Sequence, residues 1–316
     1  MNWIGFPDDR FPVFGLPWWE ETKPQLLRLP ERWRERVRPE IWGLAQAPTG
    51  GRLRFASDAT ALALRVHYPN LTYMNNMPRT GHLGVDVYVD DEYWRTVYPT
   101  DNADVEQVVF EGLPSEWREY CLYLPLYGAI EVQAIGLSEG ADIAPPAPYA
   151  VEKPVVYYGS SITQGGCATH SGMSYQAILG RMLNLDHVNL GFSGNGLGEP
   201  EVAEALAEID ACCYVMDFIA NCPDAAYGER VYAPFVQILR DHHPQTPIIL
   251  CTPNFMTPED WNPQTPLPAM REVIRRAYRA RVAAGDEQVT LVEGYDLLGP
   301  EDREGLCDGV HPNDLG

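Results

Sequence analysis

Two short segments contain the residue types that acyl transfer requires. Ser161 lies in the small, glycine-rich sequence Tyr157–Gly166, and Asp308 precedes His311 by three residues near the other end of the chain. A serine hydroxyl attacks poorly at neutral pH unless an imidazole accepts its proton, and the imidazole needs a partner on its other nitrogen. We therefore predict that Ser161 is a nucleophile, that His311 is its general base and that Asp308 orients the base.

Two further segments could stabilise the negative oxygen of a tetrahedral intermediate. In Asn189–Gly196, Gly194 has no side chain to keep its backbone N–H away from that oxygen, and Asn221 in Asp217–Pro223 offers a side-chain amide. Asp217 directly follows the apolar run Cys212–Met216, and we expect it to have a structural role. We predict that Gly194 and Asn221 contribute to an oxyanion hole.

Other polar residues are weaker candidates for a site. His170 follows the serine turn and has no partner that the sequence identifies, so it is a loop residue with a possible substrate contact. His242 and His243 follow a helical pattern without the spacing of a zinc site. The glycines after residue 193 lack the spacing of a nucleotide-binding loop. The acyl-transfer chemistry implies no metal and no organic cofactor.

The elements that must position these segments form a parallel sheet. Apolar runs alternate with helical patterns after residue 153, as in βαβ units, where chemistry gathers at the carboxyl ends of the strands. The predicted strands are Val155–Tyr158, His187–Leu190, Cys212–Met216, Pro247–Cys251 and Gln288–Val292. The predicted helices are Tyr175–Leu183, Glu201–Ile209, Ala233–His243 and Ala269–Ala284.

The N-terminal half has the pattern of an all-β sandwich related to a jelly roll. Short alternating segments are separated by turn residues. These are Arg52–Ala56, Ala61–Tyr68, Gly84–Val89, Tyr93–Tyr98, Gln107–Phe110, Tyr120–Leu124 and Ile130–Leu137. A proline-rich stretch follows. We therefore predict a sandwich over residues 1–144, a linker over 145–153 and an α/β domain over 154–316, with no regular pattern in residues 1–50.

The four segments, in this order and after these strands, resemble the blocks of the SGNH hydrolases, also called GDSL esterases. By position, Ser161 resembles the nucleophile, and its own N–H an oxyanion donor, while Gly194 and Asn221 resemble the block-two glycine and block-three asparagine. Asp308 and His311 resemble the final Asp-x-x-His pair. The first block departs from the family by reading Gly-Ser-Ser-Ile, and Asn221 lacks the usual neighbouring glycine.

This resemblance covers roughly residues 154–316 and implies a three-layer, flavodoxin-like fold with a parallel sheet. The fold usually adds a final helix beginning near Pro312, and four residues follow that proline.

The N-terminal half is similar to the Gly-x-Asp-Leu-Tyr domain that precedes the hydrolase in one bacterial branch of this family, with Gly84–Tyr88 as the matching motif. In that branch the sandwich resembles carbohydrate-binding modules and packs beside the active site. The resemblance implies that residues around Asn75 and Met77 contribute to a substrate pocket. A plain strand–turn–strand hairpin at this place is an equally good interpretation.

Charge and composition exclude several classes of partner. With 44 acidic and 23 basic side chains, the net charge of −21 repels phosphate backbones and anionic lipids, so neither nucleic acid nor a membrane is an expected partner. No signal peptide or long apolar span is recognisable, and seven cysteines without a Cys-x-x-Cys pair suit a reducing compartment. We expect a cytoplasmic protein that acts on a small acyl ester or acylated sugar, with a homo-oligomer possible.

The leading functional hypothesis is hydrolysis of small O-acyl esters on a carbohydrate, with acetyl as the expected acyl group. An acyltransferase that passes the acyl group to a hydroxyl of a specialised metabolite would use the same acyl-enzyme, so the sequence leaves both open. A non-catalytic sugar-binding protein is a third hypothesis. The presence of every residue that the mechanism needs argues against it.

Overall fold

The computed structural model describes all 316 residues, which form two compact units. Each unit combines separate stretches of the chain. The first unit consists of Met1–Glu31, Gly43–Glu152 and Ala168–Val188, and the second of Arg32–Trp42, Lys153–Cys167 and Asn189–Gly316. Each unit therefore includes one segment from the half of the sequence that mostly forms the other.

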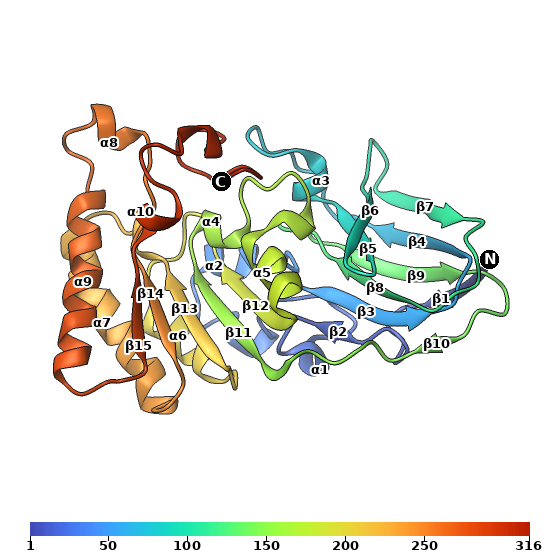
Figure 1. Cartoon of the computed structure of the whole chain (residues 1–316), viewed down its shortest axis with the longest axis horizontal. Coiled ribbons are helices and arrows are strands. Elements are labelled where there is room, and N and C mark those ends of the chain that lie inside the picture. The colour runs from blue at the N-terminus through green and yellow to red at the C-terminus, as the bar shows by residue number, and fades with distance from the viewer. The chain divides into compact units, whose positions relative to one another are not determined.

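The first unit contains two antiparallel sheets, as the alternating segments predicted (Figure 1). One sheet has the order β1-β9-β4-β7; the other has β10-β3-β8-β5-β6, with β2 also paired to β3. The strands are β1 Asn2–Gly5, β2 Val13–Phe14, β3 Arg52–Ser57, β4 Ala61–His67, β5 Val85–Val89, β6 Glu92–Val97, β7 Asp104–Glu111, β8 Arg118–Tyr123, β9 Glu131–Leu137 and β10 Ile143–Ala144.

Alternation along the strands explains where this core lies. In β4, Leu62, Leu64 and Val66 are buried, whereas Arg65 and His67 on the other face are partly exposed, because successive side chains point to opposite faces. The core joins these residues to buried side chains of β3, β5, β8 and β9. Short helices complete the unit: α1 Trp19–Thr22, α3 Arg79–His82, η2 Ser171–Met173 and α5 Tyr175–Leu183.

The second unit is built on a five-stranded parallel sheet with the order β12-β11-β13-β14-β15. The strands are β11 Val151–Gly159, β12 Leu185–Gly191, β13 Cys213–Asp217, β14 Ile248–Cys251 and β15 Val289–Val292. Numbered along the sheet's own sequence, this is the 2-1-3-4-5 order of flavodoxin-like folds, in which the chain reverses direction across the sheet between β11 and β13. The predicted fold class is confirmed.

The helices of this part are η1 Glu31–Trp33, α2 Pro39–Leu44, α4 Ser161–Gln164, α6 Pro200–Ala207, η3 Ile219–Asn221, α7 Ala225–His242, α8 Pro258–Trp261, α9 Leu267–Ala283, α10 Gly294–Leu297 and η4 Arg303–Gly305. Of the three that were predicted, α6 and α9 begin within two residues of the predicted start. Helix α7 begins eight residues before the predicted start. None of the helices has both the length and the apolar character needed to cross a bilayer.

Candidate active site

The candidate nucleophile lies at the first position of a short helix that follows the first parallel strand. Strand β11 ends at Gly159, and helix α4 begins at Ser161. Ser160 caps this helix, because its Oγ accepts a hydrogen bond from the backbone N–H of Ile162 at 3.2 Å. The N–H of Ser160 donates to the carbonyl oxygen of Asp217 at 3.3 Å, which ties the turn to the end of β13. The turn that carries Ser161 therefore lies next to the place between β11 and β13 where the strand order of the sheet reverses.

Ser161, His311 and Asp308 form a chain of hydrogen-bonding contacts. The Oγ of Ser161 lies 2.8 Å from Nε2 of His311, and Nδ1 of the same ring lies 2.8 Å from Oδ2 of Asp308. A carboxylate only accepts, so Nδ1 carries the hydrogen and Nε2 is the acceptor for the serine hydroxyl. The structure thus brings together the three residues predicted from sequence, in the order that proton removal from Ser161 requires.

The loop that carries Asp308 and His311 is held from both sides. The Oδ1 of Asp308 accepts backbone hydrogen bonds from Val310 at 3.1 Å and His311 at 2.9 Å, so one carboxylate orients both the ring and the loop. The N–H of Thr257 donates to the carbonyl of Gly309 at 2.8 Å. Gly309 has a φ of 85°, in the region that favours glycine, and a Cβ there would overlap Oγ1 of Thr257.

The predicted oxyanion donors follow β12 and β13. Gly194 is exposed, has a φ of 67°, and a Cβ at that position would meet no atom within 4 Å, so the loop is open on this side. Asn221 ends η3, and its Oδ1 accepts the N–H of Gly196 at 3.3 Å. With Oδ1 engaged, the Nδ2 group of Asn221 remains as the donating end of the amide. The role of these groups in binding an oxyanion stays a prediction.

Two amide side chains around the nucleophile were not singled out from sequence. Asn189 on β12 donates to the carbonyl of Thr163 at 2.7 Å and accepts the N–H of Gly191 at 2.9 Å. The Oε1 of Gln164 accepts the N–H of Ser193 at 2.9 Å, next to Gly194. These contacts join the turn that carries Ser161 to residues Ser193–Gly196, which we call the glycine loop. The only available sequence signal was the place of Asn189 at the end of its apolar run.

Asp217 has the structural contact that its position suggested. Its Oδ2 accepts a hydrogen bond from Oγ1 of Thr163 at 3.2 Å. Burial raises the pKa of this carboxyl to about 7, and the hydrogen bond from Thr163 opposes the shift. Asp217 therefore carries a proton over part of the pH range in which an exposed aspartate is charged.

The segment Arg32–Trp42, which had no assignable pattern, reaches the glycine loop of the second unit. Arg38 donates to the side-chain oxygen of Asn195 at 2.9 Å and to its carbonyl at 3.1 Å. Its Nε also bonds Glu199 at 2.5 Å. The guanidinium therefore fixes the residue that follows Gly194.

A thiol lies beside the same histidine. Sγ of Cys167, an oxygen of Asp308 and a ring nitrogen of His311 all lie within 4.8 Å of one another, a spacing that a metal ion could use. Both ring nitrogens of His311 already contact Ser161 and Asp308, so an ion here would compete with those contacts. Burial raises the pKa of Cys167 to about 12, with Cys307 and Asp308 adding to the shift, and a neutral thiol is a poor metal ligand.

The three predicted substrate contacts belong to the first unit, whereas Ser161, His311 and Asp308 belong to the second. Asn75 is exposed, and Met77 is buried in a cluster with Leu126 and Ala168. His170 lies with its Nδ1 2.5 Å from Oδ2 of Asp86 and stacks on a tyrosine ring. Contact of these residues with a substrate stays a prediction.

The carboxylate of the Gly84–Tyr88 motif has a structural task that the sequence did not disclose. Asp86 is fully buried and accepts hydrogen bonds from the N–H of Gly172 at 2.5 Å and from Oγ1 of Thr96 at 2.6 Å, in addition to its contact with His170. It thereby holds residues 170–172 within the first unit.

Comparisons with known proteins bear on both halves of the chain. The model of the GDSL-like lipase/acylhydrolase family matches residues 152–316, and a model of the N-terminus of SGNH-hydrolase-type esterases matches residues 1–143. A solved structure described as a GDSL-like lipase from Bacteroides ovatus is 29% identical, with a TM-score of 0.89 over 99% of this chain and 93% of that one.

Two more distant structures share the fold. A salicylyl-acyltransferase from a tetracycline biosynthetic pathway is 23% identical, with a TM-score of 0.86 over 100% of this chain and 93% of its own. A family two carbohydrate esterase from Clostridium thermocellum is 17% identical, with a TM-score of 0.65 over 85% and 88% of the two chains. No curated protein sequence matches significantly.

Proposed function

The chain belongs to the GDSL-like lipase/acylhydrolase family, and on that premise we propose that it hydrolyses small O-acyl esters, above all acetyl esters, through an acyl-enzyme on Ser161. The observation that carries the proposal is the contact of Ser161 Oγ with Nε2 of His311 at 2.8 Å, with Asp308 on the other ring nitrogen. This arrangement gives the hydroxyl a base of fixed tautomer and orientation.

In the proposed reaction, His311 Nε2 takes the proton of Ser161 as Oγ attacks the ester carbonyl. The negative oxygen of the tetrahedral intermediate is held by the N–H groups of Ser161 and Gly194 and by Nδ2 of Asn221. As the intermediate collapses, the alcohol leaves with the proton from His311. Water then attacks the acyl-enzyme while His311 takes its proton, and His311 returns that proton to Oγ of Ser161 as the acid departs.

We propose a carbohydrate or similar polyol as the alcohol part of the substrate. The likeness in fold to a carbohydrate esterase and the presence of a sandwich before the α/β half support this choice. Both supports are analogies of fold, so the acyl and alcohol groups need separate tests.

Acyl transfer is the second candidate, supported by the likeness in fold to the salicylyl-acyltransferase over the full length of this chain. The two functions share every step up to the acyl-enzyme. They differ in whether water or an alcohol attacks it. Measuring the amounts of p-nitrophenol and of free acid released, with and without added alcohols, distinguishes the two. Hydrolysis releases them in equal amounts, whereas transfer releases less free acid.

The proposal is tested by the release of p-nitrophenol from acetyl, butyryl and octanoyl esters at neutral pH. We expect the acetyl ester to react fastest, and Ser161→Ala to lower kcat by about 10⁴-fold or more, as in other serine hydrolases that lose the nucleophile.

Ser160→Ala is the matched control. It removes a helix cap worth about 1 kcal/mol but leaves the nucleophile, so an acyl adduct should still form on Ser161. If the wild-type protein turns over none of the esters and mass spectrometry finds no adduct on Ser161, the hydrolase proposal is wrong and a non-catalytic binding function replaces it.

A further inference from the structure

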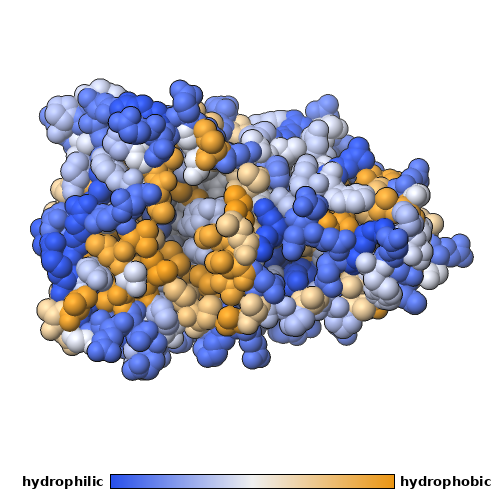
Figure 2. Space-filling model, in the orientation of Figure 1, coloured by the Kyte–Doolittle hydropathy of each residue, from blue (hydrophilic) through white to orange (hydrophobic).

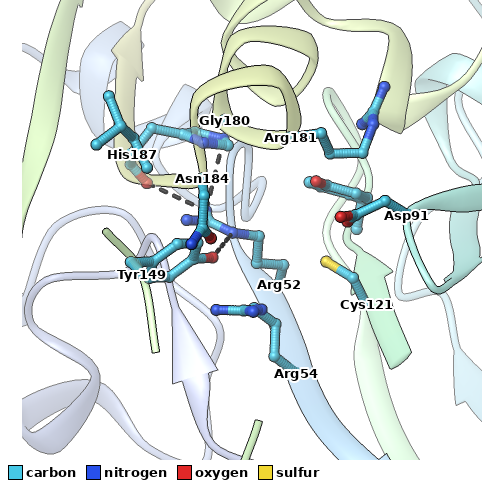
Figure 3. A pocket seen from close by; sticks show the side chains of 11 residues that line it. Arg52, Arg54, Asp91, Cys121, Tyr149, Gly180, Arg181, Asn184 and His187 are labelled. Atoms are coloured by element: carbon cyan, nitrogen blue, oxygen red, sulfur yellow. Dashed lines mark hydrogen bonds between the residues drawn. The ribbon is translucent and has the colours of Figure 1, made fainter. Parts of the chain in front are cut away.

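A second polar hollow lies wholly within the first unit, and no residue of it is used by the proposed reaction. It is lined by residues of β3, β8, α5, the loops beside them and the start of β12, whose residues up to Val188 belong to the first unit, and part of it is open to solvent. Figure 3 shows Arg52 and Arg54 entering this hollow from β3, with Cys121 on a neighbouring strand and Arg181 on the helix.

Buried donors without partners are concentrated in this hollow. In the whole structure, nine buried side-chain polar atoms have no hydrogen-bond partner. Three of them, Nη1 of Arg54, Nη1 of Arg181 and Nδ1 of His187, belong to the eleven residues that line the hollow. A buried polar atom left without a partner costs about 1–3 kcal/mol, so such a cluster indicates an absent partner.

All three unpartnered atoms are donors. A guanidinium nitrogen can only donate. Burial, together with the charges of Arg52 and Arg181, lowers the pKa of His187 well below its usual value, so the ring is neutral. Its Nε2 faces Nη1 of Arg52 at 3.5 Å and can only accept there, which leaves the ring hydrogen on Nδ1. The missing partner must therefore be an acceptor.

The charges in the hollow favour a negatively charged acceptor. Three arginines and one carboxylate, that of the exposed Asp91, line it, and three minus one leaves two positive charges. Arg52 is paired with Asp186 just outside, which leaves one. Burial raises the pKa of Cys121 to about 11 and also raises the pKa values of Tyr123 and Tyr149, so these groups are neutral at pH 7.

The two arginines with open donors are held in place by aromatic rings. The guanidinium of Arg54 lies 4.1 Å from the ring centre of Tyr149, and that of Arg181 lies 4.3 Å from the ring centre of Tyr88. Arg54 also donates one Nη2 hydrogen to the carbonyl of Ala147 at 3.1 Å. A guanidinium fixed in this way loses little freedom when it binds an oxyanion, which its planar fork suits.

Helix α5 faces the hollow with its charged residue, against the usual polarity of a surface helix. Arg181 is partly buried, whereas Leu179, Met182 and Leu183 are exposed, by 37%, 74% and 55%. Figure 2 shows hydrophobic residues gathered on the surface over α5. A helix that buries a charge and exposes leucines is unfavourable for folding. Binding of a ligand by the buried charge would account for this arrangement.

We propose that this hollow is a binding site for a small oxyanion, a phosphate or carboxylate group, held by Arg54 and Arg181 with the Nδ1–H of His187 as a third donor. The site is independent of the proposed hydrolysis. The anion is either inorganic or the acidic group of a sugar or metabolite.

Isothermal titration of the full chain with inorganic phosphate, sulfate, acetate and glucuronate tests the site and distinguishes the two sources. We expect saturable binding of at least one, with phosphate tighter than acetate if a phosphate is recognised, and glucuronate tighter than both if an acidic sugar is. Arg54→Gln should weaken binding about tenfold or more, the effect of losing a charge-assisted hydrogen bond.

Arg65→Gln is the matched control, because Arg65 is a partly exposed arginine of β4 in the same unit, paired with Glu106. Equal affinity in wild type, Arg54→Gln and Arg65→Gln would place the anion elsewhere and overturn the proposal, as would absence of saturable binding. If Arg54→Gln does not fold, crystals of the wild-type protein grown with sulfate decide the matter. Tetrahedral density against Arg54 and Arg181 supports the site, and water alone overturns it.

Discussion

Asp217 links the end of β13 to the nucleophile turn through a carboxyl whose ionisation opposes folding. Burial raises its pKa to about 7 in the folded chain, against an unfolded value near 3.8. Between these values the folded state binds the proton more strongly than the unfolded state. The contribution of Asp217 to stability is therefore greatest below about pH 4 and is lost as the pH rises toward 7.

Replacing Asp217 by asparagine should remove this penalty, since the amide oxygen can still accept the hydroxyl of Thr163 and carries no charge. We expect Asp217→Asn to raise the melting temperature by a few degrees at pH 8 and to leave it nearly unchanged at pH 4, because about 1 kcal/mol corresponds to 2–4 °C in a chain of this size. Asp241→Asn is the control at an exposed position. An equal shift at both pH values would contradict the assigned pKa.

The sequence identified the residues that local spacing or the family blocks mark, including Ser161 and His311, which are 150 positions apart. It missed side chains whose tertiary contacts no such block marks. Asp308 and His311 lie three residues apart in one loop, so their contact could be predicted from chain geometry. Asn189 and Thr163 are 26 positions apart, and Asp86 and His170 are 84 apart. Nothing local in the sequence distinguishes such side chains from ordinary strand or loop residues.

Among the elements, the loop from Cys307 to Pro312 is the one whose backbone the site depends on most. It closes on itself through the N–H of Cys307, which donates to the carbonyl of His311 at 2.8 Å. It is held from outside at Gly309, whose carbonyl accepts from the N–H and the hydroxyl of Thr257. Any side chain at Gly309 would collide with that hydroxyl.

Gly309→Ala should therefore displace the loop and separate His311 from Ser161. We expect kcat for an acetyl ester to fall at least about tenfold with little change in KM, because a displacement near 1 Å in a catalytic group can cost about 100-fold. Gly285→Ala is a sharp control. That glycine has a nearly equal φ of 86° and open space around it, so it should lose some stability but no activity. Equal kcat values for both variants would show that the loop tolerates the shift.

Helix α7 shows where prediction of elements from sequence fails. Gly228 weakens the helical pattern before residue 233, and Pro234 is of a type that favours the first turn of a helix, yet the helix runs from Ala225 to His242. Its start is set by Asp224, whose Oδ1 accepts the N–H of Tyr227 at 2.7 Å. At Gly228 the helix packs closely against η3, since a Cβ there would lie 3.0 Å from Cδ1 of Ile219. Tertiary packing thus overrides the weak local propensity.

For the molecule as a whole, the surprising part of the sequence is the N-terminal stretch before residue 50. It had no periodicity because its contacts are made by single side chains. Trp33 is almost fully buried, and Arg38 bonds Asn195 next to Gly194 in the second unit. Arg38 is a positioning residue for the glycine loop, because it contacts Asn195 and is not one of the residues proposed to touch the substrate.

We predict that Arg38→Met lowers kcat about tenfold while KM changes little, because the donor at Gly194 acts on charge that develops in the transition state. Arg38→Lys keeps the charge without the fork and should recover part of the loss. Arg36→Met is the matched control, since Arg36 forms a half-exposed pair with Glu204 of a kind worth less than about 1 kcal/mol. A rise in KM alone would indicate a substrate contact in place of a positioning role.

The exchange of segments between the two units also governs the order in which the protein can fold on the ribosome. The first unit includes residues up to Val188, so it stays incomplete until more than half of the chain has been synthesised. Residues Arg32–Trp42 emerge early but wait for partners in a unit that ends at Gly316. A nascent chain normally completes its N-terminal domain first. Here the first unit can close only once Val188 has been synthesised, and Arg32–Trp42 must wait longer still, because most of the second unit follows that residue.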